Sequence, residues 1–246
     1  MNSKINKIIL VQFRTDESRN DEQKSLLRHI SRYKNKLIIV DAFDESEYFA
    51  HPDKNINKDD KIILGGSGQF SFSEHYKKPY SNQFSRMIHR IADFIQHILQ
   101  NDIHTMGICF GHQLLAHSLG SKIIQDAKQK EVGSFIVSLS EQGLLDPLFN
   151  GISKTFYTQE GHNDSLETLP LKTIILAQGK KCKIQSFRYK KNIYGVQFHP
   201  ELSIEDVMKK IKLYHNYTKN KKISYIIKNL HPTPEASRII NNFLDL

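Results

Sequence analysis

The fold of this chain is decided by the stretch MGICFGHQ, residues 106–113. An apolar run, 103–108, leads into it, and a helix-like stretch, 112–119, leads out. Between them the pattern G-x-C-x-G places Cys109 at the tip of a tight strand-to-helix turn, clear of the backbone. Unpaired N–H groups at the start of the helix favour a thiolate, which is the nucleophilic form of cysteine. The pattern therefore predicts a reactive Cys109, although a free cysteine is often a small buried hydrophobe.

A second stretch, YGVQFHPE at residues 194–201, supplies the partners that a nucleophilic cysteine needs. It reads as another strand, with His199 and Glu201 just beyond its end. Cysteine catalysis requires a histidine that accepts the proton and a third group that orients the histidine. The two stretches together predict a catalytic triad of Cys109, His199 and Glu201.

The motifs GICFGHQ and GVQFHPE together resemble those of the class I, triad-type glutamine amidotransferases, in particular the glutaminase domain of GMP synthase. The resemblance runs from about residue 8 to about residue 202. It implies hydrolysis of the γ-amide of glutamine through a cysteinyl γ-glutamyl thioester, without a cofactor. The ammonia would pass to an acceptor or partner that the sequence does not identify.

The glycine loop 65–68 follows a predicted strand at 61–64. Glycines let a backbone approach a ligand closely and point N–H groups into a site, although a plain turn would also use them. The resemblance implies that the N–H groups of Gly66 and Phe110 form the oxyanion hole. The family often has proline after the paired glycines, whereas this chain has Ser67, so the shape of the loop is open.

The resemblance also implies which residues bind the substrate. Gln113, one helical turn past the nucleophile, should face the pocket and bond the substrate. Family members carry a His-x-Asp motif whose backbone N–H groups hold the substrate α-carboxylate, which assigns that role to Asn163 and Asp164. The neighbouring His162 receives a structural role, because the histidine of the second motif has the better context for catalysis.

Continuous apolar strands alternate with helices along the first half of the chain, and the helix at 82–100 has the clearest stripe of apolar residues at 3.6 spacing. This alternation predicts an α/β fold with a doubly wound, mostly parallel sheet flanked by helices. The expected fold is flavodoxin-like, with a small antiparallel extension and a helical C-terminal tail. We expect residues 1–203 to form the amidotransferase domain and 204–246 a helical extension packed on it. An aromatic stretch, 69–80, would either edge the active-site mouth or pack its own rings.

Composition narrows the class of protein further. The net charge is +9, but the lysines are dispersed without an aromatic-interleaved basic motif, which favours a solvated surface over nucleic-acid binding. No apolar run reaches the roughly 18 residues that span a bilayer, so we expect a cytoplasmic protein with no membrane partner. The two cysteines and 12 histidines show no zinc-ligand spacing, so no metal is expected, and Cys182 is interpreted as structural.

Three functions remain open from the sequence. The first is a glutaminase that hands ammonia to a separate synthase subunit, since we expect no ATP-binding loop or second core on this chain. The second is a stand-alone γ-glutamyl peptide hydrolase that uses the same triad on a larger substrate, with the aromatic stretch gripping the leaving group. The third is a non-catalytic binding protein, which the complete triad disfavours.

Overall fold

The computed structural model describes residues 5–77, 82–213 and 223–246. Their organising element is a nine-stranded mixed sheet. In spatial order its strands are β2 (Leu37–Asp41), β1 (Ile8–Gln12), β3 (Lys61–Leu64), β4 (Thr105–Ile108), β11 (Ile193–Val196), β10 (Ser186–Tyr189), β9 (Thr173–Gly179), β6 (Glu131–Leu139) and β7 (Thr155–His162).

The strands from β2 to β11 are parallel, and their order 2-1-3-4-11 is that of a flavodoxin-like sheet. The central strands β1, β3 and β4 are buried along their whole length, which is why their sequences are continuously apolar. In such sheets ligands bind beyond the carboxyl ends of the strands, where the strand order reverses. The loops after β1, β3, β4 and β11 therefore share one edge of the molecule.

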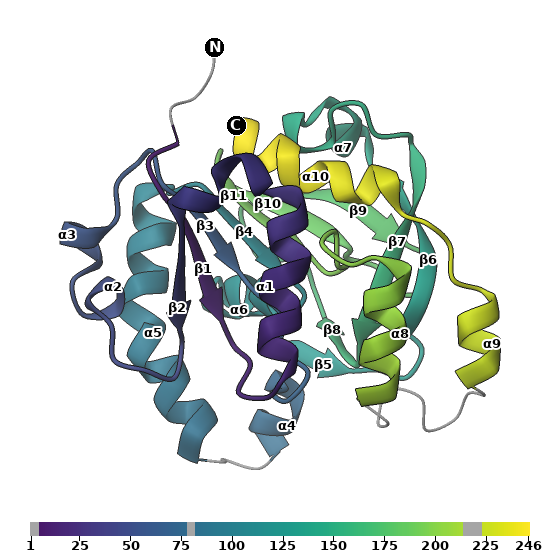
Figure 1. Ribbon diagram of the computed structural model, residues 1–246, viewed down its shortest axis with the longest axis horizontal. Helices are drawn as coiled ribbons and strands as arrows, with labels where there is room; N and C mark the ends of the chain where they lie inside the picture. Colours follow the sequence, from purple (N-terminus) through teal and green to yellow (C-terminus); the bar gives the residue numbers. More distant parts are fainter. Residues whose placement is uncertain (1–4, 78–81, 214–222) are drawn as a thin grey trace.

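Helices cover both faces of the parallel strands (Figure 1). Helices α5 (Asn82–Asn101) and α6 (Phe110–Ser118) pack on one face, and α1 (Ser18–His29) and α10 (Pro234–Asp245) on the other. The apolar stripe predicted for 82–100 is buried in the first core, which confirms that helix. The expected doubly wound architecture is therefore confirmed.

The second half of the sheet is antiparallel and is larger than the small extension that the sequence suggested. β10, β9, β6 and β7 pair antiparallel in turn beyond β11. A separate two-stranded sheet joins β5 (Ile123–Gln125) to β8 (Asp164–Leu166). The remaining short elements are α2 (Glu47–Ala50), α3 (Pro52–Asn55), α4 (Phe72–Lys77), α7 (Glu141–Leu145), α8 (Ile204–Leu213), α9 (Ile223–Lys228) and the 3-10 turns η1 (Ser31–Lys36) and η2 (Pro147–Phe149).

The aromatic stretch 69–80 does not edge the active-site mouth where it is described. Phe72 begins α4 and stacks on Phe110, with ring centroids 5.1 Å apart. Phe70 packs against Phe43 and Phe84. These rings complete a core between α5, α6 and the sheet, whereas Tyr80 lies outside the described residues.

The C-terminal tail contributes directly to the second core. Five apolar residues of α10 are fully buried there: Ala236, Ile239, Ile240, Phe243 and Leu244. Polar side chains of α10 bind neighbouring turns; Asn242, for example, donates to the carbonyl of Leu148 in η2 at 2.9 Å. We propose on this ground that residues 204–246 extend the same domain. The predicted helix at 203–217 is present as α8 up to residue 213, and its last residues lie outside the described part of the chain.

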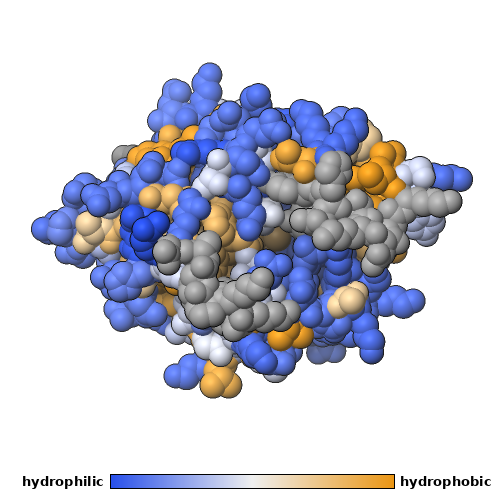
Figure 2. Space-filling model, turned by 90° about the horizontal axis from the view of Figure 1, so that it is seen from below, coloured by the Kyte–Doolittle hydropathy of each residue, from blue (hydrophilic) through white to orange (hydrophobic). Residues whose placement is uncertain are grey.

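Seen from the edge where the parallel strands end, the surface is mostly hydrophilic (Figure 2). Among the described residues, none of the helices combines the length and apolar character that crossing a bilayer demands.

Candidate active site

Cys109 lies between β4 and α6 in a backbone conformation that few residues other than glycine adopt, with φ of 51°. Its N–H donates to the carbonyl of Val196 at 2.8 Å, which ties the turn to β11. The two glycines of the motif are required by close packing. A Cβ on Gly107 would collide with the Gly111 backbone, and one on Gly111 would collide with the carbonyl of Leu64. The G-x-C-x-G spacing thus follows from the sharpness of this turn.

His199 and Glu201 follow β11 and are joined by a hydrogen bond of 2.7 Å between Nδ1 and Oε1. Because a carboxylate only accepts, Nδ1 carries the hydrogen and leaves Nε2 as the free proton acceptor. Burial lowers the pKa of His199, and the attraction of Glu201 offsets part of that shift. Burial alone would raise the pKa of Glu201, but its interactions with His199 lower it to about 2. At neutral pH the pair is therefore a neutral imidazole held by an ionised carboxylate.

The nucleophile, the histidine and the glycine loop meet at one point. A Cβ added to Gly66 would lie 3.1 Å from Cε1 of His199 and 3.8 Å from Cβ of Cys109. The structure therefore brings together the three sequence-predicted triad residues and the loop predicted to hold the oxyanion. The loop lies beyond β3, so all four groups stand at the carboxyl ends of adjacent parallel strands.

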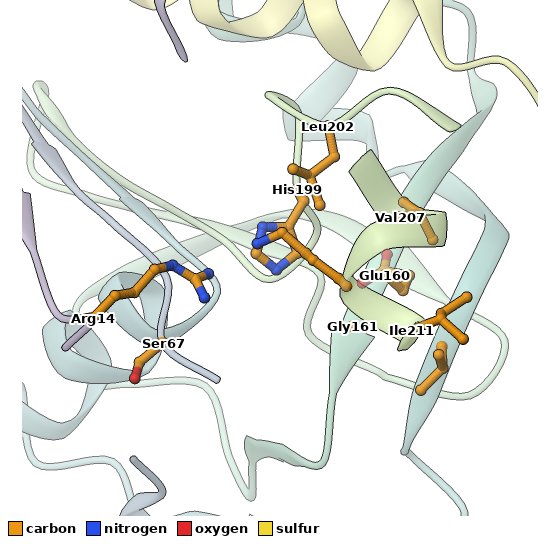
Figure 3. A pocket seen from close by; sticks show the side chains of 10 residues that line it. Arg14, Ser67, Glu160, Gly161, His199, Leu202, Val207 and Ile211 are labelled. Carbon is orange, nitrogen blue, oxygen red and sulfur yellow. The ribbon is translucent and has the colours of Figure 1, made fainter. Parts of the chain in front are cut away.

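The pocket over this point is nearly closed. Its cavity volume is about 20 Å³, which is room for about one water molecule. Figure 3 shows Arg14 and Ser67 on one side of His199, and Val207 and Ile211 of α8 on the other. Cys109 is 4% exposed, and burial raises the pKa of its thiol to about 12. In this closed state burial outweighs the helix N-terminus, contrary to the thiolate expected from the sequence.

The N–H group of Gly66 is occupied by a residue that the sequence motifs do not indicate. It donates to Oε1 of Glu22 on α1 at 2.9 Å. The same carboxylate accepts from Nε of Arg14 at 3.1 Å and, through Oε2, from the side-chain amide of Gln12 at 2.9 Å. Arg14 and Glu22 are 2% and 3% exposed, so this ion pair is inside the protein. Only the position of Arg14, directly past the end of the first strand, could have indicated it.

Lys210 is a second pocket residue that the sequence motifs do not indicate. It lines the pocket from α8, within the segment interpreted as an extension. Burial lowers its pKa to about 8, with a further contribution from Arg14, while Glu201 opposes the shift. Amphipathic spacing alone placed it on a solvated helix face, so the sequence held no signal for its position.

The predicted substrate-binding residues lie next to this pocket, but their side chains are engaged within the protein. The amide of Gln113 donates to the carbonyl of Asp164 and to Oε1 of Gln197, both at 3.1 Å. The carboxylate of Asp164 accepts from the hydroxyl of Ser73 at 2.6 Å and so anchors the start of α4. Asn163 is half-buried between β7 and β8. Gln113 therefore positions the segment 162–164 rather than pointing freely into the pocket.

Phe110, the second predicted oxyanion-hole residue, is the first residue of α6. Its ring points into the core and contacts Phe13 and Phe72, so only its backbone faces the turn at Cys109.

The family comparison agrees with this arrangement. Residues 20–216 match the family model "Glutamine amidotransferase class-I". The chain belongs to the class I glutamine amidotransferase family. The match covers the parallel sheet from β2 onward, both motifs and α8, and ends before α10.

Several proteins similar to this amidotransferase are named as glutamine-hydrolysing subunits of GMP synthase. One from Methanosphaera stadtmanae is 35% identical over 54% of this chain and 68% of its own length. Another from Sulfurisphaera tokodaii is 30% identical over 68% of this chain and 80% of its own. The match to the GMP synthase of Thermosipho melanesiensis is 33% identical but covers 23% of that longer protein.

A solved structure shows the same fold. The crystal structure of a glutamine amidotransferase from Thermotoga maritima superposes with a TM-score of 0.72, covering 98% of this chain and 96% of the other. The sequence identity is 20%, so this likeness concerns the fold of this amidotransferase.

Proposed function

We propose that the chain is a glutaminase that releases ammonia from the γ-amide of glutamine. The observation that carries the proposal is the meeting of Cys109, the His199–Glu201 pair and the Gly66 loop at one point. Hydrolysis of an amide by cysteine needs these three functions together: a nucleophile, a proton acceptor and donors for the oxyanion.

The chemistry proceeds in two steps. Nε2 of His199 takes the thiol proton as Sγ of Cys109 attacks the amide carbon, and then passes that proton to the leaving nitrogen, which departs as ammonia. The products of this step are the cysteinyl γ-glutamyl thioester and ammonia. A water molecule, activated by His199, then attacks the thioester and frees glutamate. Glu201 holds the imidazole in the required tautomer throughout and stabilises its charged form.

The oxyanion hole is proposed to form from the N–H groups of Gly66 and Phe110. In the closed state the first of these groups is bound to Glu22, so the loop must rotate before it can face the substrate. After release, the carboxylate of Glu22 still has Arg14 and Gln12 as partners. The net cost is about one hydrogen bond to a charged group, roughly 1.5–3 kcal/mol, or about a 10- to 150-fold loss of rate.

A partner protein is the proposed source of this opening energy. Relatives of this chain are named as one subunit of GMP synthase, and we propose that this chain too hands ammonia to a separate synthase subunit. Docking near Lys210 and the 65–68 loop would then open the pocket and free Gly66. The isolated chain should accordingly hydrolyse glutamine slowly.

The competing γ-glutamyl peptide hydrolase has lost its main support. The aromatic rings at Phe70 and Phe72, which were expected to hold a large leaving group, are packed in the core. No other described feature favours a substrate larger than glutamine.

The test is glutamate release from glutamine and from a panel of γ-glutamyl peptides, with Cys109→Ala as the inactive control. We expect turnover of glutamine, slow for the isolated chain and abolished in the variant. Much faster turnover of a γ-glutamyl peptide by the isolated chain would overturn the assignment of the substrate. Full activity of Cys109→Ala would overturn the mechanism.

A further inference from the structure

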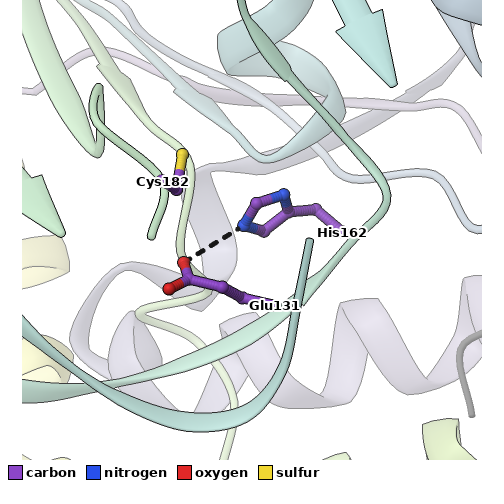
Figure 4. Close-up of side chains that lie close together, drawn as sticks. All are labelled: Glu131, His162 and Cys182. Atoms are coloured by element: carbon purple, nitrogen blue, oxygen red, sulfur yellow. Dashed lines mark ion pairs between the residues drawn. The ribbon is translucent and has the colours of Figure 1, made fainter. Parts of the chain in front are cut away.

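Three buried side chains from distant parts of the sequence converge beneath the antiparallel half of the sheet (Figure 4). Glu131 begins β6, His162 ends β7, and Cys182 lies in the segment between β9 and β10. One donor atom from each of them lies within 4.8 Å of the others, and all three residues are at most 2% exposed. We propose that Glu131, His162 and Cys182, with Glu160 as fourth ligand, bind a divalent zinc-type ion that fixes the 162–164 segment.

The orientation of His162 is that of a metal ligand. Its Nδ1 lies 2.9 Å from the carbonyl oxygen of Asp164. A carbonyl only accepts, so Nδ1 carries the hydrogen and Nε2 presents a lone pair. Metal-binding histidines usually donate their other ring N–H to a carbonyl or carboxylate in this way. The free Nε2 faces Oε2 of Glu131 at 3.5 Å and Oε2 of Glu160 at 3.6 Å.

Two of the atoms that face one another have no hydrogen-bond partner among the described residues: Nε2 of His162 and Oε2 of Glu160. The other oxygen of Glu160 already accepts from the hydroxyl of Thr158 at 2.8 Å. Unpartnered polar atoms are rare in a protein interior because each costs free energy. A lone pair that faces two buried carboxylates needs a cation between them, and this is what the three acceptors share.

Charge balance favours a divalent ion over a proton. The ion pairs found for these carboxylates are both with His162. Burial and the neighbouring Glu131 raise the pKa of Glu160 well above its ordinary value, as expected for two negative charges without compensation. A dication neutralises both carboxylates at once and leaves His162 neutral.

The donor set selects the ion. Nitrogen, sulfur and carboxylate oxygen are the ligands of tetrahedral zinc sites, whereas magnesium and calcium prefer oxygen alone. Zinc bonds of about 2.0–2.3 Å place neighbouring donors about 3.5 Å apart. The two distances from His162 already match this spacing. The thiol of Cys182, now directed at the carbonyl of Ile184, would lose its proton on binding and turn toward the ion.

The location gives the ion a structural role beside the pocket. His162 immediately precedes Asn163, and the carbonyl of Asp164 receives both the ring of His162 and the amide of Gln113. An ion on Nε2 would therefore fix the ring and, through it, the backbone at 162–164. Glu160 and Gly161 also line the pocket, so the ion would stiffen one of its walls.

The experiment uses the full chain, stripped with a chelator and then dialysed against zinc, magnesium or cobalt(II). We expect one zinc per chain, no retained magnesium, and a Tm that rises with zinc. Cobalt(II) should give the intense thiolate charge-transfer absorption of a tetrahedral sulfur-containing site. Cys182→Ser and His162→Gln should lose zinc and the cobalt band, whereas Cys109→Ser, the matched control, should keep both.

Two results would overturn the proposal. One is wild-type protein that retains no zinc and shows no cobalt–thiolate absorption, which would leave His162 as a proton-bridged imidazolium. The other is zinc bound equally by wild type and Cys182→Ser. The cobalt spectrum is recorded on the wild-type chain, so it decides the question even if a variant fails to fold.

Discussion

Replacing Gly66 by alanine tests the geometry at the centre of the proposed active site. The added Cβ would lie 2.9 Å from Nη2 of Arg14 and 3.1 Å from Cε1 of His199, against an ordinary contact of about 3.4 Å. His199 must therefore move by about 0.3 Å and Arg14 by about 0.5 Å. A misplacement of about 1 Å near the reacting groups costs about 10²-fold in rate, so these shifts should cost about 4- to 10-fold.

The same substitution should leave stability almost unchanged. Gly66 does not lie in the left-handed region, and the atoms that the methyl group meets are the ends of side chains. A Gly→Ala change at a permissive position also lowers the entropy of the unfolded chain by roughly 0.4–1 kcal/mol, which offsets the crowding. The Tm should therefore change by less than about 4 °C.

The assay compares wild type, Gly66→Ala and Ser67→Ala in glutamate release and in the rate at which a glutamine-like diazo-ketone alkylates Cys109. Ser67→Ala is the matched control, because it alters the same loop without adding bulk beside His199. It removes only two hydrogen bonds of 3.3 Å to the N–H groups of Gln69 and Phe70. A Gly66→Ala enzyme with wild-type rates and wild-type Tm would refute the convergence of the loop and the triad.

Two further predictions concern buried charges. Glu201→Gln should lower kcat by up to about 10²-fold while leaving measurable glutamate release, because the pKa of Glu201 falls from 4.5 to about 2, roughly 3 kcal/mol of interaction mainly with His199; an unchanged kcat would contradict this role. Burial lowers the pKa of His112 to about 3, so stability should be lost as pH falls from 6.5 toward 3, by about 2 kcal/mol between pH 7 and pH 5. Urea unfolding at both pH values should show that loss reduced by a similar amount in His112→Gln, and equal losses in the two proteins would exclude His112 as the cause.

The local parts of the site could be read from the sequence because short-range sterics impose them. The turn at Cys109 needs small residues at 107 and 111, and the collisions that a Cβ would cause there show why. The pairing of His199 with Glu201 needs only two residues of separation beyond a strand. The helix at 82–100 was equally accessible, since its stripe of apolar residues repeats with the helical period.

Contacts between distant segments had no such signal. Glu22 lies 44 positions from Gly66, and nothing in the pattern of α1 distinguishes a carboxylate that binds a loop from one that faces solvent. The Glu131, His162 and Cys182 cluster escaped for the same reason, because its members have none of the short spacings by which zinc sites are recognised. The phenylalanines at 70 and 72 were misplaced because a polar, aromatic stretch gives no clear period.

The burial of α10 has a consequence for biosynthesis. Residues 234–245 follow every strand of the sheet in chain order, yet their apolar side chains close one of its faces. While the ribosome is still making this segment, the finished strands present an uncovered apolar surface over β1, β3 and β4. Exposed surface of this kind makes folding intermediates prone to aggregation. The nascent protein therefore completes its fold only near the end of translation, and until then it is a natural client for chaperones.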